Sequence, residues 1–284
     1  MESTTAAPLD ERTTGKLRRL NVIVGLVAAA QAIVLLIIAK PASLPVNMTY
    51  MLGPPGEGKY SAPTELFGMR IDIAVALFLL LAAADHLIVA SPLANRWYNA
   101  NVARGVNPAR WWEYSISASL MIVLIAMLTG ISEGTALIAI FGVNAAMILF
   151  GLVMEYANEG RETVDWRPFI YGCIVGAVPW IAIAIQLFPI NLDSGGQAPT
   201  FVYVIFFTLF VLFNTFAINM WLQYRRNGRW QSPVHAERVY LWLSLIAKSV
   251  LAWQVYAGAL AGSQQAARLV LREYLPHESG AGGH

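Results

Sequence analysis

The stretch LSLIAKSVLAW, residues 243–253, places one lysine at the centre of an otherwise apolar run. This run covers about residues 239–261, enough for a helix to cross the ~30 Å hydrocarbon core of a bilayer. Lys248 lies 15 residues beyond Pro233, too deep for its amine to reach the membrane surface easily. A charge at that depth costs several kcal/mol on insertion scales, so it needs a partner or a purpose. The stretch therefore predicts a transmembrane helix with a functional lysine.

Six further segments are apolar over a similar length. They cover residues 20–39, 67–90, 111–131, 135–155, 168–189 and 200–223. The chain is 57% hydrophobic and 13% charged, whereas soluble domains are about 25% charged. We therefore expect an all-α membrane protein, a bundle of seven transmembrane helices over residues 20–262, between an N-terminal segment (1–19) and a tail (263–284). The net charge of +2 is too small, and its basic residues too dispersed, for nucleic-acid binding.

The distribution of Lys and Arg predicts the orientation in the membrane, because cytoplasmic loops carry the excess of positive charge. Five of the 19 lie on the side that faces away from the N-terminus, at Lys40, Lys59, Arg70, Arg268 and Arg272, and Lys248 lies within the membrane. The other 13 lie on the N-terminal side, at Arg12, Lys16, Arg18, Arg19, Arg96, Arg104, Arg110, Arg161, Arg167, Arg225, Arg226, Arg229 and Arg238. The N-terminus is thus predicted to be cytoplasmic and the C-terminus extracellular.

The connection between the first two spans is the longest external loop. Its sequence GPPGEG, residues 53–58, is typical of a turn, with extended segments at Val46–Leu52 and Lys59–Leu66. An extracellular β-hairpin over the outer mouth is expected. The loop also contains Asn47-Met48-Thr49, a glycosylation sequon that matters only in a secretory-pathway host.

Small residues and the single cysteine bear on packing. Cys173 excludes intramolecular disulfides and cysteine-based zinc sites, and we interpret it as core packing. We expect neither a metal site nor an enzyme's catalytic residues. Gly172 and Gly176 permit a close helix approach, which suits either a dimer interface or packing within one bundle.

Lys248 itself admits two interpretations, a structural lysine paired with an acid or a desolvated amine suited to form a Schiff base. Its obvious partner is Glu113, a carboxylate within the third span. The third and seventh spans run in the same direction, so depths can be compared by counting residues. The two side chains differ in depth by about five residues, or about 7 Å, which a lysine side chain can bridge. A Glu113–Lys248 pair is therefore expected.

Other polar residues share this level of the bundle. Asp85 and His86 lie near the inner end of the second span, and a histidine there can exchange a proton near neutral pH. Each of the remaining candidates is equally well explained as a bond between helices or to its own backbone. These candidates for a proton network are Tyr114, Ser117, Asn144, Glu155 and Ser244.

Several local strings in spans two to seven and the first loop narrow the choice of family. They are YMLGPPG (50–56), RWWEYS (110–115), IFGVNAAMILFG (140–151), GAVPW (176–180) and SLIAKSVLAWQ (244–254). In combination they resemble heliorhodopsins, retinal-binding rhodopsins of inverted topology with the N-terminus inside. The orientation inferred from the charges agrees with this resemblance.

The resemblance implies all-trans retinal attached to Lys248 as a protonated Schiff base, with Glu113 as its counterion. It further implies a slow photocycle without ion pumping, a sensory or regulatory role, a cytoplasmic signalling partner, and a homodimer through the fourth and fifth spans. Ser244 would tune the Schiff base, and His86 would belong to a cytoplasmic cluster that takes up the released proton. The implied retinal pocket comprises Met147, Ile148, Gly151, Pro179, Trp180 and Phe213.

The sequence departs from the family pattern at two positions. Relatives tend to carry a second histidine in the first span, where this chain has Ala28, and Asp85 is also unexpected. We therefore hypothesise a proton-accepting cluster rebuilt around Asp85, His86 and Glu155. Two alternative functions stay open, a light-driven pump or channel, and a small transporter that uses Glu113 and Lys248 as a coupling pair.

Overall fold

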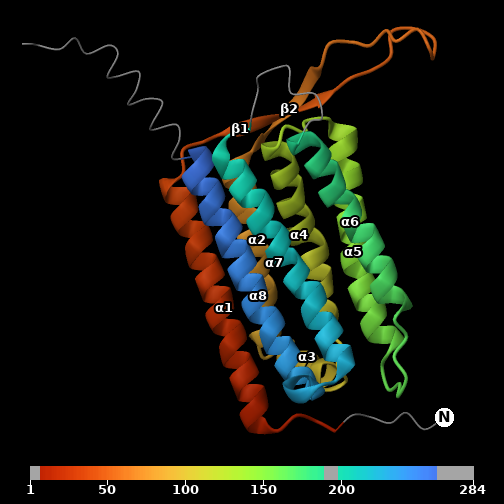
Figure 1. Ribbon diagram of the computed structural model, residues 1–284. Helices are drawn as coiled ribbons and strands as arrows, with labels where there is room; N and C mark the ends of the chain where they lie inside the picture. Colours follow the sequence, from red (N-terminus) through yellow and green to blue (C-terminus); the bar gives the residue numbers. More distant parts are fainter. Residues whose placement is uncertain (1–6, 189–197, 261–284) are drawn as a thin grey trace, which may run out of the picture.

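Seven long helices form one bundle in the computed structural model, which describes residues 7–188 and 198–260 (Figure 1). The long helices are α1 Glu11–Ile38, α2 Ile71–Ala90, α4 Pro108–Leu128, α5 Gly134–Ala157, α6 Arg167–Leu187, α7 Thr200–Arg225 and α8 Pro233–Val255. Each is long and apolar enough to cross a membrane. The expected seven-helix membrane bundle is confirmed, and the chain is a multi-pass membrane protein. The expected tail at 263–284 lies outside the described residues.

Helix starts follow local capping chemistry. The Asp10 carboxylate accepts hydrogen bonds from the Thr13 hydroxyl (2.8 Å) and the Thr13 backbone N–H (2.7 Å), and these bonds lower the pKa of Asp10. This cap starts α1 at Glu11, nine residues before the predicted span. Pro108 and Pro233 open α4 and α8, where the missing proline N–H costs nothing. Beyond Val255, α8 continues as a π-helical turn, η3 (Tyr256–Leu260).

The two ends of the bundle differ. One end carries the start of α1, the short helix α3 (Asn95–Ala103) and the 3-10 turn η2 (Gly228–Gln231), and we call it the α3 side (Figure 1). The opposite end carries the β-hairpin, and we call it the hairpin side. The sequence analysis missed α3 because nine largely polar residues give no membrane-span signal.

The hairpin begins closer to the bundle than predicted. Its strands are β1 (Ser43–Met48) and β2 (Thr64–Arg70), which pair antiparallel with an irregularity between Val46 and Asn47. The predicted strand boundaries were therefore wrong, although the hairpin itself is present. The irregularity arises because the Asn47 backbone N–H donates to Ser132 O (2.8 Å) on the α4–α5 connection instead of to β2.

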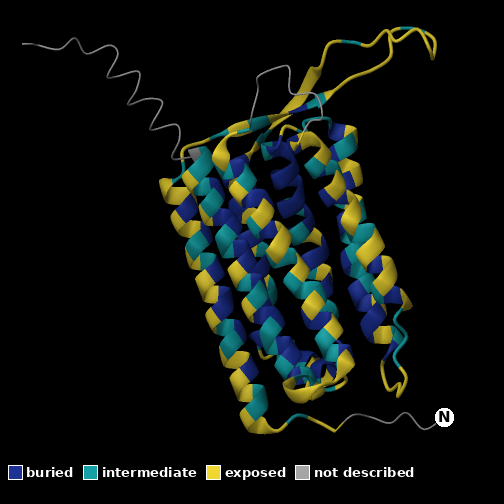
Figure 2. Ribbon diagram, in the orientation of Figure 1, coloured by how far each residue is buried: buried dark blue, intermediate teal, exposed yellow. Residues whose placement is uncertain are grey.

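Buried residues face the middle of the bundle, and large apolar residues cover its outside, as suits a lipid environment (Figure 2). Of the seven spans, α4 is the most enclosed. A polar side chain on α4 is consequently presented to the other helices rather than to lipid.

Gly172 and Gly176 bring α6 close to α5 of the same chain. A Cβ atom at Gly176 would lie 2.8 Å from Met147 Cγ, and one at Gly172 would lie 3.2 Å from Phe150 Cβ. The two glycines thus serve packing within the bundle.

Candidate functional site

Lys248 and Glu113 form an ion pair inside the bundle. Lys248 is 3% exposed, and its Nζ lies 2.8 Å from Glu113 Oε1 and 2.9 Å from Oε2. The amine also donates to Ser244 Oγ (3.3 Å), one helical turn earlier on α8. A buried cation is tolerable only when it is paired and hydrogen-bonded. The depth argument from the sequence therefore matches the observed pair.

Of the other residues expected near this pair, Tyr114 lies beside Lys248, whereas Ser117 and Asn144 make no hydrogen bond to it. The Tyr114 ring lies 5.0 Å from Lys248 Nζ, and its hydroxyl donates to Tyr240 O (3.2 Å). The Ser117 hydroxyl is buried without a hydrogen-bond partner among the described residues. Asn144 donates instead to Ser119 Oγ (3.0 Å). Neither Ser117 nor Asn144 therefore makes a hydrogen bond to Lys248 or Glu113, and their part in the Lys248 network stays a prediction.

A cavity of about 300 Å³ adjoins Lys248. Helices α4 to α8 enclose it, and its lining is largely aromatic and aliphatic, which is the usual character of a small-molecule site. Five of the six expected pocket residues line it, namely Met147, Ile148, Gly151, Trp180 and Phe213. Pro179 is buried but does not line the cavity. Trp180 faces the cavity, and Pro179 is turned about 100° away around α6.

Several aromatic lining residues escaped the sequence analysis. Trp111 is the most important, because its ring lies where a side chain at Gly151 would be, 2.4 Å from a Cβ built there. Phe210 and Phe216 on α7 also line the cavity. Their helical spacing was the available signal, but aromatic residues in a membrane bundle are more often ordinary core.

The cavity opens sideways between α6 and α7. Cys173, Phe210 and Asn214 line it and are nevertheless exposed on the lipid-facing surface. The interpretation of Cys173 as core packing was therefore wrong, since it lies at the rim of this opening.

A second buried ion cluster lies toward the α3 side. Arg110 on α4 pairs with Glu155 on α5 and with Glu237 on α8. Glu237 also accepts from Asn107 Nδ2 (2.9 Å), and Glu155 accepts from the Asn107 backbone N–H (2.7 Å). Glu155 makes no direct contact with Asp85 or His86, so the hypothesised three-residue cluster is not assembled as such.

His86 is held by α1 rather than by Glu155. Its Nδ1 lies 2.9 Å from Asn21 Oδ1 and 4.0 Å from Asp85 Oδ2. Ala28 is buried on α1 and offers no polar side chain, so Asn21, seven residues earlier, provides the contact between α1 and His86.

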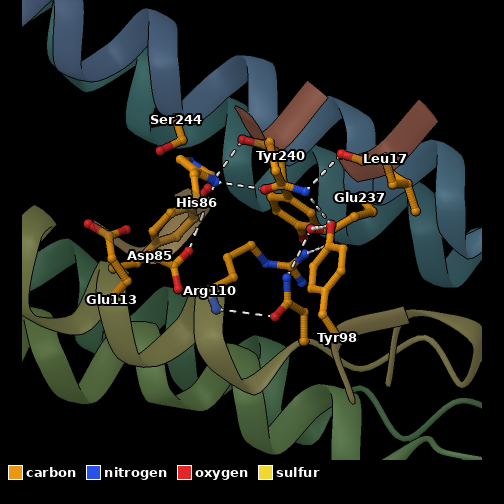
Figure 3. Close-up of polar contacts among 12 residues, drawn as sticks. Leu17, Asp85, His86, Tyr98, Arg110, Glu113, Glu237, Tyr240 and Ser244 are labelled. Carbon is orange, nitrogen blue, oxygen red and sulfur yellow. Dashed lines mark hydrogen bonds and ion pairs between the residues drawn. The ribbon is translucent and has the colours of Figure 1, made fainter. Parts of the chain in front are cut away.

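Asn21 then links His86 to the second cluster. Its Nδ2 donates to Tyr98 OH (3.1 Å), and Tyr98 OH donates to Glu237 Oε1 (3.0 Å). Figure 3 shows His86 and Asp85 between Glu113 and Ser244 on one side and Arg110, Glu237 and Tyr98 on the other. The sequence analysis missed Asn21, Tyr98 and Glu237, and counted Arg110 only as a topology signal.

Comparison with known families settles the class of this bundle. The heliorhodopsin family model matches residues 17–260, which include both ion clusters and the cavity. The chain belongs to the heliorhodopsin family. No protein with curated annotation matches it. Membership in the heliorhodopsin family implies a retinal-binding, light-sensing rhodopsin.

The residues of the cavity fit a retinal chromophore. An elongated apolar molecule requires apolar walls, and a covalent link to a carbonyl compound requires an amine. The cavity offers both, since Lys248 is among its lining residues and Trp111, Trp180 and Phe213 provide aromatic walls.

Proposed function

We propose that the protein is a heliorhodopsin photoreceptor in which all-trans retinal is attached to Lys248 Nζ and Glu113 is the counterion. The observation that carries this proposal is the Lys248–Glu113 pair at the edge of an apolar cavity. When bound, retinal supplies the light-absorbing polyene and its isomerisation. Glu113 balances the positive charge at Nζ, Ser244 orients the amine, and the aromatic walls exclude water.

A slow photocycle without pumping is the second part of the proposal. A pump needs polar groups on both sides of the amine, because the ion must enter at one face and leave at the other. Here the polar groups near Lys248 extend toward the α3 side, through His86, Asn21 and Tyr98. On the hairpin side, α4 is buried and apolar from Met121 to Met127. This asymmetry favours a sensor over a pump or channel.

A proton that leaves Lys248 Nζ is held, we propose, by His86 with Asp85 beside it. Nε2 of His86 is buried without a hydrogen-bond partner among residues 7–188 and 198–260. The Asp85 carboxylate, 4.0 Å from Nδ1, stabilises a positive charge on the ring.

The proposal also includes the setting in the membrane. We place the N-terminus and the α3 side in the cytoplasm, on the distribution of Lys and Arg. The α3 side would contact a signalling partner there. A homodimer through α5 and α6 would use exposed apolar residues such as Ile138, Ile174 and Ile185, since Gly172 and Gly176 are occupied within the chain.

The direct test is the visible spectrum of the protein purified with all-trans retinal. We expect an absorption band that Lys248→Ala abolishes. Glu113→Gln should move the band to longer wavelength, because the positive charge at Nζ loses its stabilising partner. Glu65→Gln, on the exposed hairpin, is the matched control and should leave the band in place. A band that persists in Lys248→Ala would refute the attachment site.

A second measurement separates a sensor from a pump. Cells that contain the pigment are illuminated, and the pH of the suspension is followed with and without a protonophore. We expect no light-driven pH change in either case. A protonophore-sensitive change would show transport and favour the pump.

A further inference from the structure

Among the described residues, Asn21 is the one side chain that is hydrogen-bonded both to His86 and to Tyr98, which in turn donates to Glu237 of the Arg110 cluster. It is fully buried on α1. Its Oδ1 faces His86 Nδ1, and its Nδ2 donates to Leu17 O (3.1 Å) and Tyr98 OH (3.1 Å). All polar atoms of the amide are therefore used.

The hydrogen bonds that link Glu237, Tyr98, Asn21 and His86 all take their direction from Glu237. Its carboxylate can only accept while it is ionised, so Tyr98 OH must donate to it. The Tyr98 oxygen is then free to accept from Asn21 Nδ2. With its NH₂ group so engaged, Asn21 can present only its carbonyl oxygen to His86.

This order fixes the tautomer of the histidine. Because Asn21 Oδ1 is an acceptor, His86 Nδ1 must carry the hydrogen. Nε2 of a neutral imidazole is then a bare acceptor, and this is the atom that lacks a partner. The charged side chains around the ring are Asp85 on its own helix and Lys248 on α8, and the Glu237 carboxylate is reached through Asn21 and the neutral Tyr98 hydroxyl.

The same bonds stop a proton at His86. A proton taken up on Nε2 can continue toward Tyr98 and Glu237 only by transfer of the Nδ1 hydrogen to Asn21 Oδ1. An amide oxygen is a very weak base, and the amide has no ionisable hydrogen that it releases readily to Tyr98. The row of hydrogen bonds from Glu237 to His86 therefore fixes which atoms donate and which accept, but it does not conduct a proton.

We propose that Asn21 is a positioning residue that sets the Nδ1–H tautomer of His86 and insulates that histidine from the Tyr98–Glu237–Arg110 cluster. The proposal rests on the proposed function for its photocycle part. It explains how a bundle with a polar chain toward one face retains a proton during the photocycle.

The tautomer is tested without reference to light. ¹⁵N-histidine-labelled protein is studied by solid-state NMR, with His86→Gln used to assign the signal. We expect a protonated Nδ1 and a bare Nε2 for His86. A protonated Nε2 in the wild-type protein would overturn the first half of the proposal.

The insulation is tested by Asn21→Asp in proteoliposomes with a pH indicator on each side of the membrane. A carboxylate in this position can accept the Nδ1 hydrogen and pass a proton to the Tyr98 oxygen while Tyr98 gives its own hydroxyl proton to Glu237. A light-induced proton signal should then appear on the α3 side, where the wild type gives none. The matched control is Asn219→Asp, another buried asparagine toward the α3 side, which bonds Ala236 O and Trp230 Nε1 and lies off the chain.

The outcomes separate the two proposals. If Asn21→Asp keeps the visible band but releases no proton, or if Asn219→Asp releases as much, the insulating role of Asn21 is wrong. If the wild type forms no visible band, the proposed function fails, and the NMR result still decides the tautomer. If Asn21→Asp does not fold, Asn21→Ser replaces it for NMR, and an unchanged His86 tautomer in that variant would refute the positioning role.

Discussion

Arg110 illustrates at the scale of one residue why a buried charge is retained. Its guanidinium serves Glu155 and Glu237, and all three side chains are at least nine-tenths buried. Removal of the shared cation would leave two buried carboxylates close together without a positive partner. Buried pairs are costly to break even where they contribute little net stability when intact.

Arg110→Met should therefore destabilise the protein strongly, by about 3–5 kcal/mol. The measurement is thermal or denaturant unfolding of the purified protein in detergent. Arg104→Met is the matched control, because Arg104 pairs with Glu159 at a partly exposed site and its loss should cost less than about 1 kcal/mol. Equal losses of stability in the two variants would show that the buried Arg110 cluster contributes no more to folding than the exposed Arg104–Glu159 pair.

Gly151 is the residue that admits the Trp111 ring beside α5. Gly151→Ala should push that ring into the cavity, because the new Cβ would lie 2.4 Å from it. We expect a loss of about 1–3 kcal/mol from overpacking, together with less bound chromophore at a given retinal concentration. Unfolding and the ratio of visible to protein absorbance report the two effects.

The control for this substitution lies on the same helix. Gly142→Ala meets nothing within 4 Å and faces outward, so it should be neutral or slightly stabilising. A similar loss of chromophore in both variants would point to a general effect on α5 instead of to the Trp111 contact.

At the scale of elements, the hairpin is anchored to the bundle through the α4–α5 connection. Glu133 accepts from the Thr49 backbone N–H (2.9 Å) and the Thr49 hydroxyl (3.0 Å), and Asn47 Nδ2 donates to Ser132 Oγ (3.0 Å). These contacts explain why β1 departs from a regular ladder after Val46. They also engage the Asn47 amide, the acceptor of the glycosylation sequon.

Glu133→Ala should loosen this end of β1 without unfolding the bundle. We expect the backbone amide of Thr49 to exchange its hydrogen about tenfold faster, since a hydrogen bond to a charged acceptor is worth about 1.5 kcal/mol. Hydrogen exchange followed by mass spectrometry or NMR would measure it. Glu57→Ala, in the exposed Glu57–Lys59 pair at the hairpin tip, should leave Thr49 unchanged. Equal acceleration in both variants would contradict the anchoring role.

At the scale of the whole molecule, the orientation prediction can be tested by chemical labelling. In a Cys173→Ser background, Pro55→Cys lies near the hairpin tip, and Asn227→Cys lies between α7 and η2 on the α3 side. With the N-terminus inside, a membrane-impermeant maleimide should label the Pro55→Cys variant in intact cells and the Asn227→Cys variant only after lysis. The reverse pattern would invert the topology and the proposed output face.

The sequence by itself determined the seven spans and the pairing of Lys248 with Glu113. Both follow from one-dimensional counting, because apolar length sets the span and residues of parallel helices can be compared by depth. It also identified five residues of the cavity wall, four of them within the strings on α5 and α6 that resemble the family.

Only the tertiary structure decided which neighbours the other polar side chains meet. Asn21, Tyr98 and Glu237 lie on three different helices, far apart in the sequence, and their bonds depend on how those helices rotate and pack. The same holds for Gly172 and Gly176. Their sequence spacing allowed either a dimer interface or packing within one bundle, and the structure shows that they pack against α5 of the same chain. A residue's depth can be counted along the chain, but the direction in which its side chain points within the bundle is fixed by the packing of all the helices together.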